Sequence, residues 1–140
     1  MEFKRRGDLL VIRLDEDDEI IERLITICSR ERVEAGIILS LIGAVKECQL
    51  IFREGCQEAF KEHFEVLGNG NITILEGQPK IHLHVTCGND VKVKTGHLVE
   101  GTVTVFCEIV VKIMEGFKME RRLDEKLLKE EVKFPYRLTP

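Results

Sequence analysis

The sequence predicts an α+β domain in which a largely antiparallel sheet packs against one helix. One amphipathic helical segment lies near the start of the chain, and most of the other apolar residues fall in strand-length runs separated by turns. The chain has 140 residues, of which 44% are hydrophobic. A chain of this length and composition can bury a core of its own, so we expect a single domain over residues 1–140.

The first part of the chain supplies a strand, the helix and a second strand. Residues 9–14 are typical of a strand, and the acidic run 15–18 places negative charge where the dipole of a following helix favours it. From Glu19 to about Arg32 the apolar residues fall on one helical stripe. Residues 37–42 form a continuous apolar run, which predicts a strand covered on both faces.

The rest of the chain is dominated by strands. Gly43 and Ala44 are expected to end the apolar run, and residues 68–71 are expected to form a turn in which Gly70 and Asn71 adopt positive φ. The tail around residues 124–128 forms either a short helix or an edge strand. Because many strands leave edges and apolar faces to cover, we also expect self-association. Further strands are predicted at residues 46–53, 60–67, 72–75, 101–114 and from residue 81 onward.

Charge and composition exclude several classes of protein. The net charge of −4 argues against strong nonspecific DNA binding by an isolated subunit, because phosphate neutralisation needs a basic face. No apolar run is long enough to span a bilayer, and the N-terminus lacks the pattern of a secretory signal, so we expect a cytoplasmic protein. The five cysteines contain no C-x-x-C pair, which favours free buried thiols over disulfides or a thiolate metal site.

Three histidines are the strongest functional signal in the sequence. His82 and His84 lie two residues apart in a predicted strand, so their rings project from the same face. If the strand that carries His97 pairs beside it, three imidazoles meet at one point. Three imidazoles with an open fourth position suit zinc and similar divalent ions. The alternative is that these histidines line a ligand pocket or a subunit interface and hold no metal.

Three more polar residues are candidates for supporting this site. Asn71 or Glu108 is expected to orient an imidazole or a bound water, and Glu108 also needs a partner if it is buried. Arg13 lies in an otherwise apolar strand, so we expect it to be buried and paired with Glu65 or Glu108. The alternative for Arg13 is an anion-binding role beside the histidines. No nucleophile or general base stands out, so neither a catalytic residue nor a reaction is assigned.

Several segments together resemble the plants-and-prokaryotes-conserved domain, or PPC domain, over nearly the whole chain. The resemblance implies an α+β fold with a large antiparallel sheet, assembled as a homotrimer. Leu41 and Thr95 depart from the family pattern, because glycine is common at both positions. The two histidine-bearing segments are the most specific of the matching set, which is Arg13-Leu14, the acidic helix start, Gly36–Gly43, Glu65–Leu67, Gly70–Ile72, Pro79–His84 and Gly96–Gly101.

The resemblance also implies a class of function. Stand-alone prokaryotic members are commonly labelled DNA-binding by association with plant members, which carry an AT-hook before this domain. Residues 4–7, Lys-Arg-Arg-Gly, lack the Gly-Arg-Pro core of that hook, which is the element with a clear way of reading DNA.

Three hypotheses follow. The first is a DNA-associated regulatory or scaffolding homotrimer, with DNA or other regulatory proteins as partners. The second is a metal-dependent small-ligand binder or enzyme that uses His82, His84 and His97, with a divalent metal such as zinc. The third is a protein-interaction module whose histidines only stabilise assembly.

Overall fold

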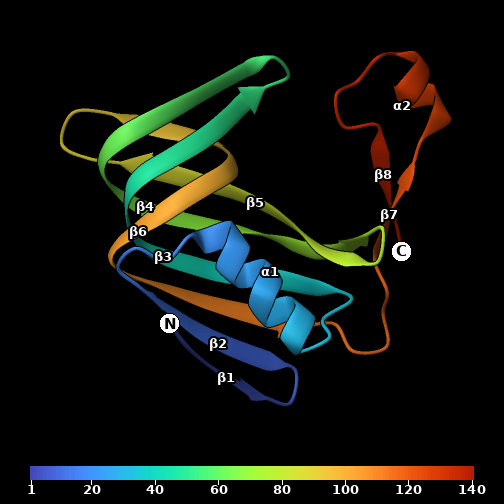
Figure 1. The fold of residues 1–140 in the computed structure, drawn as a ribbon, viewed down its shortest axis with the longest axis horizontal. Helices are drawn as coiled ribbons and strands as arrows, with labels where there is room; N and C mark the ends of the chain where they lie inside the picture. Colours follow the sequence, from blue (N-terminus) through green and yellow to red (C-terminus); the bar gives the residue numbers. More distant parts are fainter.

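The protein is described in a computed structural model that covers residues 1–140. Its strands form one eight-stranded sheet that is almost wholly antiparallel, and the longer helix packs against it (Figure 1). The predicted α+β class is therefore confirmed. No helix has the length and apolar character needed to cross a membrane. In chain order the elements are β1 (Glu2–Arg6), β2 (Leu9–Asp15), α1 (Ile20–Arg30), β3 (Gly36–Arg53), β4 (Cys56–Leu75), β5 (Gln78–Gly88), β6 (Val93–Ile113), β7 (Glu120–Leu123), α2 (Glu125–Lys129) and β8 (Tyr136–Thr139).

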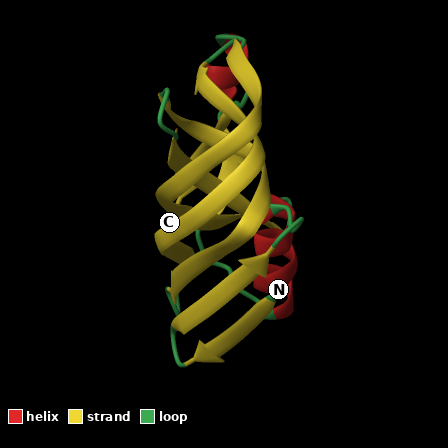
Figure 2. Ribbon diagram, turned by 90° about the vertical axis from the view of Figure 1, so that its left-hand side faces the viewer, coloured by secondary structure: helices red, strands yellow, loops and turns green.

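The four longest strands pair in a closed circuit. β3 pairs with both β4 and β6, and β5 pairs with the same two strands. β2 and then β1 extend the sheet beyond β6. Figure 2 shows the strands as a strongly twisted layer with α1 on one side. The circuit brings distant segments of the chain together, including the two that carry the predicted site.

The core lies between α1 and the sheet face beneath it. The apolar stripe of α1 is buried at Ile20, Leu24 and Ile27, and the alternating residues Leu10 and Ile12 of β2 are buried with them. Glu19 caps the helix, because its carboxylate accepts the N–H of Glu22. The same side chain also accepts the N–H of Gly101 on β6, which ties the start of the helix to the sheet.

Two predicted chain breaks are strand interiors. β3 runs through Gly43 and Ala44, and β4 runs through residues 68–71. The predicted turn at 68–71 is wrong, since neither Gly70 nor Asn71 has a positive φ. At Gly70 a Cβ atom would instead lie closer than 3.0 Å to the backbone of β5. The glycine is therefore required for the close approach of two strands and not for a turn.

One face of the sheet is apolar and uncovered. In β3, Ile38 and Leu41 are buried, whereas Leu39 and Ile42 are 52% and 59% exposed. The prediction that residues 37–42 are covered on both faces is thus wrong for a single chain, because only the α1 side is covered. Other exposed apolar residues of the same strands and their neighbours are Leu9, Val11, Ile37, Leu67 and Val105.

Candidate metal centre

The predicted histidines meet where β5 and β6 lie side by side. His84 on β5 stands directly opposite His97 on β6 in the antiparallel register. His82 precedes His84 by two residues and shares its face of β5. The ring centroids are 5.1 Å apart for His82 and His84, 5.2 Å for His82 and His97, and 5.7 Å for His84 and His97. The prediction that the three rings converge is confirmed.

The donor atoms of this cluster have the spacing of a metal site. One ring nitrogen from each histidine lies within 4.8 Å of the other two. The Nε2 atoms of His82 and His84 are 3.3 Å apart. Two nitrogens bound to one tetrahedral zinc at about 2.05 Å stand roughly 3.3 Å apart, so one edge of the site already has this length. For all three nitrogens to bind one tetrahedral ion, the His97 ring would have to move closer to the other two.

Burial and positive charge lower the pKa of two of these imidazoles, those of His82 and His97. Burial lowers the pKa of His82 to about 4, and the charges of His97 and Arg121 act in the same direction. Burial also lowers the pKa of His97, with smaller effects from His84 and Lys80. The neutral imidazole is the form that binds metals. At neutral pH, protons therefore compete little with a metal for His82 and His97.

Arg121 on β7 is the site residue that sequence reasoning missed. Its Nη2 donates to Nδ1 of His82 at 3.2 Å and to Oδ1 of Asn71 at 3.5 Å, and its Nε donates to Oγ1 of Thr73 at 3.2 Å. A guanidinium has no acceptor, so Nδ1 of His82 supplies the lone pair and Nε2 carries the proton of this neutral ring. A metal bound at Nε2 would move that proton to Nδ1, and Nδ1 would then no longer accept from Arg121. In the backbone register a single pair, Ile74–Glu120, joins β7 to β4, and no local sequence pattern predicts this contact.

Asn71 lies near the histidines and is connected to them through Arg121. It stands directly opposite His82 in the register of β4 and β5. Its side-chain oxygen accepts a hydrogen bond from the Arg121 guanidinium, and no hydrogen bond joins it to an imidazole. Asn71 therefore orients the arginine, which in turn contacts His82.

The structure places Arg13 and Glu108 away from the histidines. They face each other in the register of β2 and β6, and Glu108 is exposed. The Arg13 side chain is 56% exposed, pairs with Asp15 at 3.3 Å and lies over the Phe106 ring. The predicted buried ion pair of Arg13 with Glu65 or Glu108 is wrong, because alternate residues of β2 from Leu9 face solvent and Arg13 is one of them.

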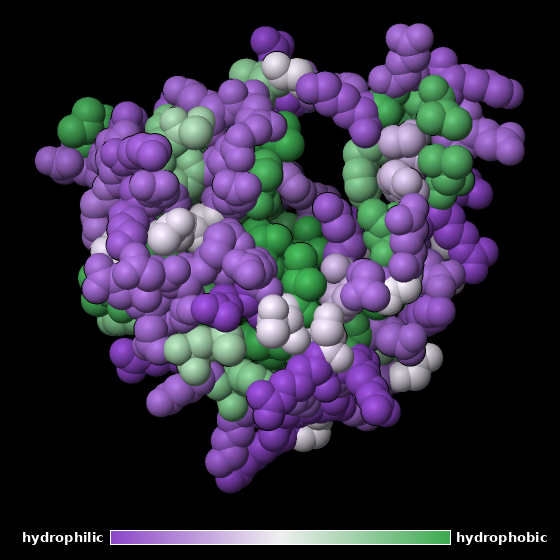
Figure 3. Space-filling model, viewed as in Figure 1, coloured by the Kyte–Doolittle hydropathy of each residue, from purple (hydrophilic) through white to green (hydrophobic).

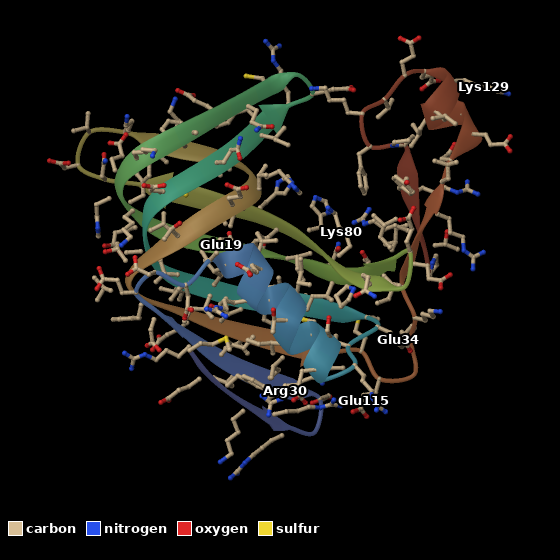
Figure 4. The ribbon with its side chains drawn as sticks, viewed as in Figure 1. Glu19, Arg30, Glu34, Lys80, Glu115 and Lys129 are labelled. Atoms are coloured by element: carbon tan, nitrogen blue, oxygen red, sulfur yellow. The ribbon has the colours of Figure 1, made fainter.

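A hollow of about 390 Å³ opens beside the rings. It lies between the sheet and the C-terminal segment, where Figure 3 shows an opening and Figure 4 places Lys80. Lys80 and Arg121 bring positive charge to its wall, and no aspartate or glutamate lines it. The full lining is Ile51, Lys80, Ile81, His82, His97, Val99, Arg121 and Phe134.

Comparison with known proteins gives both family and fold matches. The family model described as the Plants and Prokaryotes Conserved (PCC) domain matches residues 1–115. A solved structure of a candidate DNA-binding protein from Bacteroides thetaiotaomicron is 25% identical, with a TM-score of 0.85, and the match covers 99% of this chain and 96% of that chain. A plant- and prokaryote-conserved (PPC) protein from Pyrococcus horikoshii is 27% identical, with a TM-score of 0.77 and coverage of 99% and 93%.

A third solved structure, of a metal-containing protein from Archaeoglobus fulgidus, is 24% identical, with a TM-score of 0.82 and coverage of 99% and 97%. No curated protein matches the chain. The three structures share the fold of this chain over nearly its whole length.

Proposed function

We propose a metal-binding function for this chain, which belongs to the Plants and Prokaryotes Conserved domain family, the PPC family that its motifs resemble. His82, His84 and His97 would hold one divalent ion such as zinc, and the adjoining hollow would admit a small ligand. The observation that carries the proposal is the convergence of three ring nitrogens within 4.8 Å of one another. No carboxylate or thiolate belongs to this group, so the donor set is purely imidazole and suits zinc better than magnesium or calcium.

The surrounding residues hold Arg121 beside the site. A divalent ion held by three imidazoles keeps a free position at which it acts as a Lewis acid. Arg121 lies beside Nδ1 of His82, and Asn71 and Thr73 hold Arg121 in place. With a metal at Nε2, Nδ1 of His82 would carry the proton, so the guanidinium would be free to turn its donors toward a ligand. No side chain there is placed as a nucleophile or a general base, so the proposed function is binding of a ligand at the metal.

Elemental analysis tests the metal. Protein without a histidine tag, stripped with a chelator, supplied with zinc and desalted, should retain about one ion per chain. The same protein desalted without added zinc is the baseline. Fewer than roughly a tenth of an ion per chain after zinc is supplied would overturn the metal site.

We infer a second candidate function, that of a DNA-associated regulatory or scaffolding protein acting as a cytoplasmic homotrimer. The uncovered apolar face of β3, with Leu39 and Ile42 more than half exposed, favours assembly because other copies would cover it. The relative from Bacteroides thetaiotaomicron, described as a candidate DNA-binding protein, favours the association with DNA. The net charge of −4 favours recruitment of other regulatory proteins over a role that depends on phosphate contacts alone.

Sedimentation and a salt-titrated gel shift test this second candidate. A homotrimer should sediment with about three times the mass of the chain. A protein that contacts 6–10 phosphates should lose roughly 10³ to 10⁵ in affinity for a labelled duplex between 50 and 200 mM salt. A well-folded trimer that gives no shift at low salt would contradict the DNA role, and a stable monomer would contradict the assembly.

A further inference from the structure

Two cations in the histidine pocket have no carboxylate partner. Lys80 and Arg121 line the pocket, and neither makes an ion pair. The basic residues near Arg121 in the sequence differ, because Lys118 and Arg122 both pair with Glu120, at 2.7 and 2.8 Å. Withdrawing a charge from water without a counter-ion is unfavourable. The pocket therefore presents positive charge that the chain itself leaves uncompensated.

Arg121 is fixed in place by neutral groups. Its Nε and Nη2 atoms donate to Thr73, Asn71 and His82, and Thr73 is fully buried. The Nη1 atom donates to no protein acceptor. A preorganised guanidinium with free donors is the usual partner of a carboxylate or phosphate group.

The pocket lining also contains apolar side chains, one of which lies over both cations. Ile51, Val99 and Phe134 line the pocket, and the Phe134 ring centroid lies 5.4 Å from Nζ of Lys80 and 5.9 Å from Cζ of Arg121. A bare inorganic anion needs no such surface. The volume of about 390 Å³ falls within the roughly 300–1,000 Å³ typical of small-molecule pockets. The two cations and the apolar side chains together fit a molecule that is charged at one end and apolar at the other.

We propose that this pocket binds a small organic anion, a carboxylate or phosphate monoester joined to an apolar group. Its anionic oxygens would lie on Arg121 and Lys80, and its apolar part would pack against Ile51, Val99 and Phe134. The inference deepens the proposed function by naming its ligand class, and it rests on that function for the role of the histidines. The contacts of the ligand with Arg121, Lys80 and the apolar residues do not depend on the metal. Binding of the ligand can therefore be tested with the metal-free protein.

Calorimetric titration of the metal-free protein tests the ligand class. Phenyl phosphate and benzoate are the probes for the two anionic groups, and inorganic phosphate and benzyl alcohol carry only one half of the proposed ligand each. At least one probe should bind with a stoichiometry of about one per chain. Its affinity should be about tenfold or more higher than that of inorganic phosphate or of benzyl alcohol. Failure of both probes to bind would overturn the proposal. An affinity for inorganic phosphate equal to that for phenyl phosphate would also overturn it, because a site for phosphate alone or for a nucleic-acid backbone gives that result.

Charge-removing variants test the residues. Arg121→Gln and Lys80→Gln should each weaken probe binding by about tenfold or more, since hydrogen bonds to charged groups contribute about 1.5–3 kcal/mol. Arg122→Gln is the matched control, because Arg122 is the neighbouring residue, is paired with Glu120 and lies outside the pocket. Equal effects of Arg121→Gln and Arg122→Gln would overturn the assignment. If Arg121→Gln fails to fold, the loss of probe binding in Lys80→Gln, compared with Arg122→Gln, tests the assignment.

Zinc retention measured on the same proteins separates this inference from the proposed function. Lys80→Gln should lose the probe but keep its zinc, because the three imidazoles and Arg121 remain. Arg121→Gln should lose the probe and lower zinc affinity by no more than about 10–100-fold, since Arg121 lies beside His82. If no protein retains zinc while the unaltered chain binds the probe through Arg121, the metal site is contradicted and the anion site stands. If zinc is retained and no probe binds, the anion site alone is contradicted.

Discussion

His84→Gln and His97→Gln should each abolish retention of zinc by the purified protein. The two side chains are opposite each other across β5 and β6, and each supplies one of only three donor nitrogens in the cluster. Loss of a partner that merely orients a ligand typically lowers metal affinity about 10–100-fold, so loss of a ligand itself should cost more than that. Zinc per chain after desalting, and competition with a chromophoric chelator, measure the effect.

His63→Gln is the matched control for these variants. His63 is 55% exposed, contacts Glu65 and lies outside the cluster, so zinc binding should not change. Zinc retention by His84→Gln equal to that of the unaltered chain would place the metal elsewhere. If both cluster variants instead lose thermal stability, and the unaltered chain binds no zinc, the histidines serve packing or assembly.

The histidine cluster was largely predictable because it depends on short-range geometry. Residues two apart on a strand share a face whatever the fold, so His82 and His84 had to lie together. Only the pairing of β5 with β6 was needed to add His97. Arg121 was not predictable, because its place depends on where a short strand beyond β6 meets β4 through one register pair. No periodicity or spacing encodes a contact of that kind.

The fold was predictable in class but not in the extent of its strands. Alternation and β-branched residues identified strand segments, yet a glycine within such a run has two physical meanings. It can supply a positive φ at a turn, or it can let another backbone come close. Gly70 belongs to the second kind, and the sequence around it, Gly-Asn-Gly-Asn, is typical of the first. Arg13 shows a similar limit, because the side of the strand that faces solvent depends on what covers the sheet.

Gly70→Ala should strongly destabilise the protein and disturb the metal site. The new Cβ would lie closer than 3.0 Å to the carbonyl oxygen of His82 and 2.9 Å from Cα of Leu83. These are backbone atoms, so relief of the clash requires β4 and β5 to separate where Leu83 is fully buried. We expect the free energy of unfolding, measured by urea denaturation, to fall by about 3 kcal/mol or more. Zinc affinity should fall with it, because the displaced backbone carries His82.

Gly88→Ala is the control that isolates this steric effect. Gly88 lies on β5 as well, has no positive φ, and a Cβ there would meet nothing closer than Val93 Cγ2 at 3.5 Å. Its substitution should change the free energy of unfolding by no more than about 0.5 kcal/mol. Equal losses for the two variants would mean that any alanine weakens the strand pairing. A fully stable Gly70→Ala protein would contradict the close approach of β4 and β5. It would also contradict the register of these strands, which places His82 opposite Asn71 and beside Arg121.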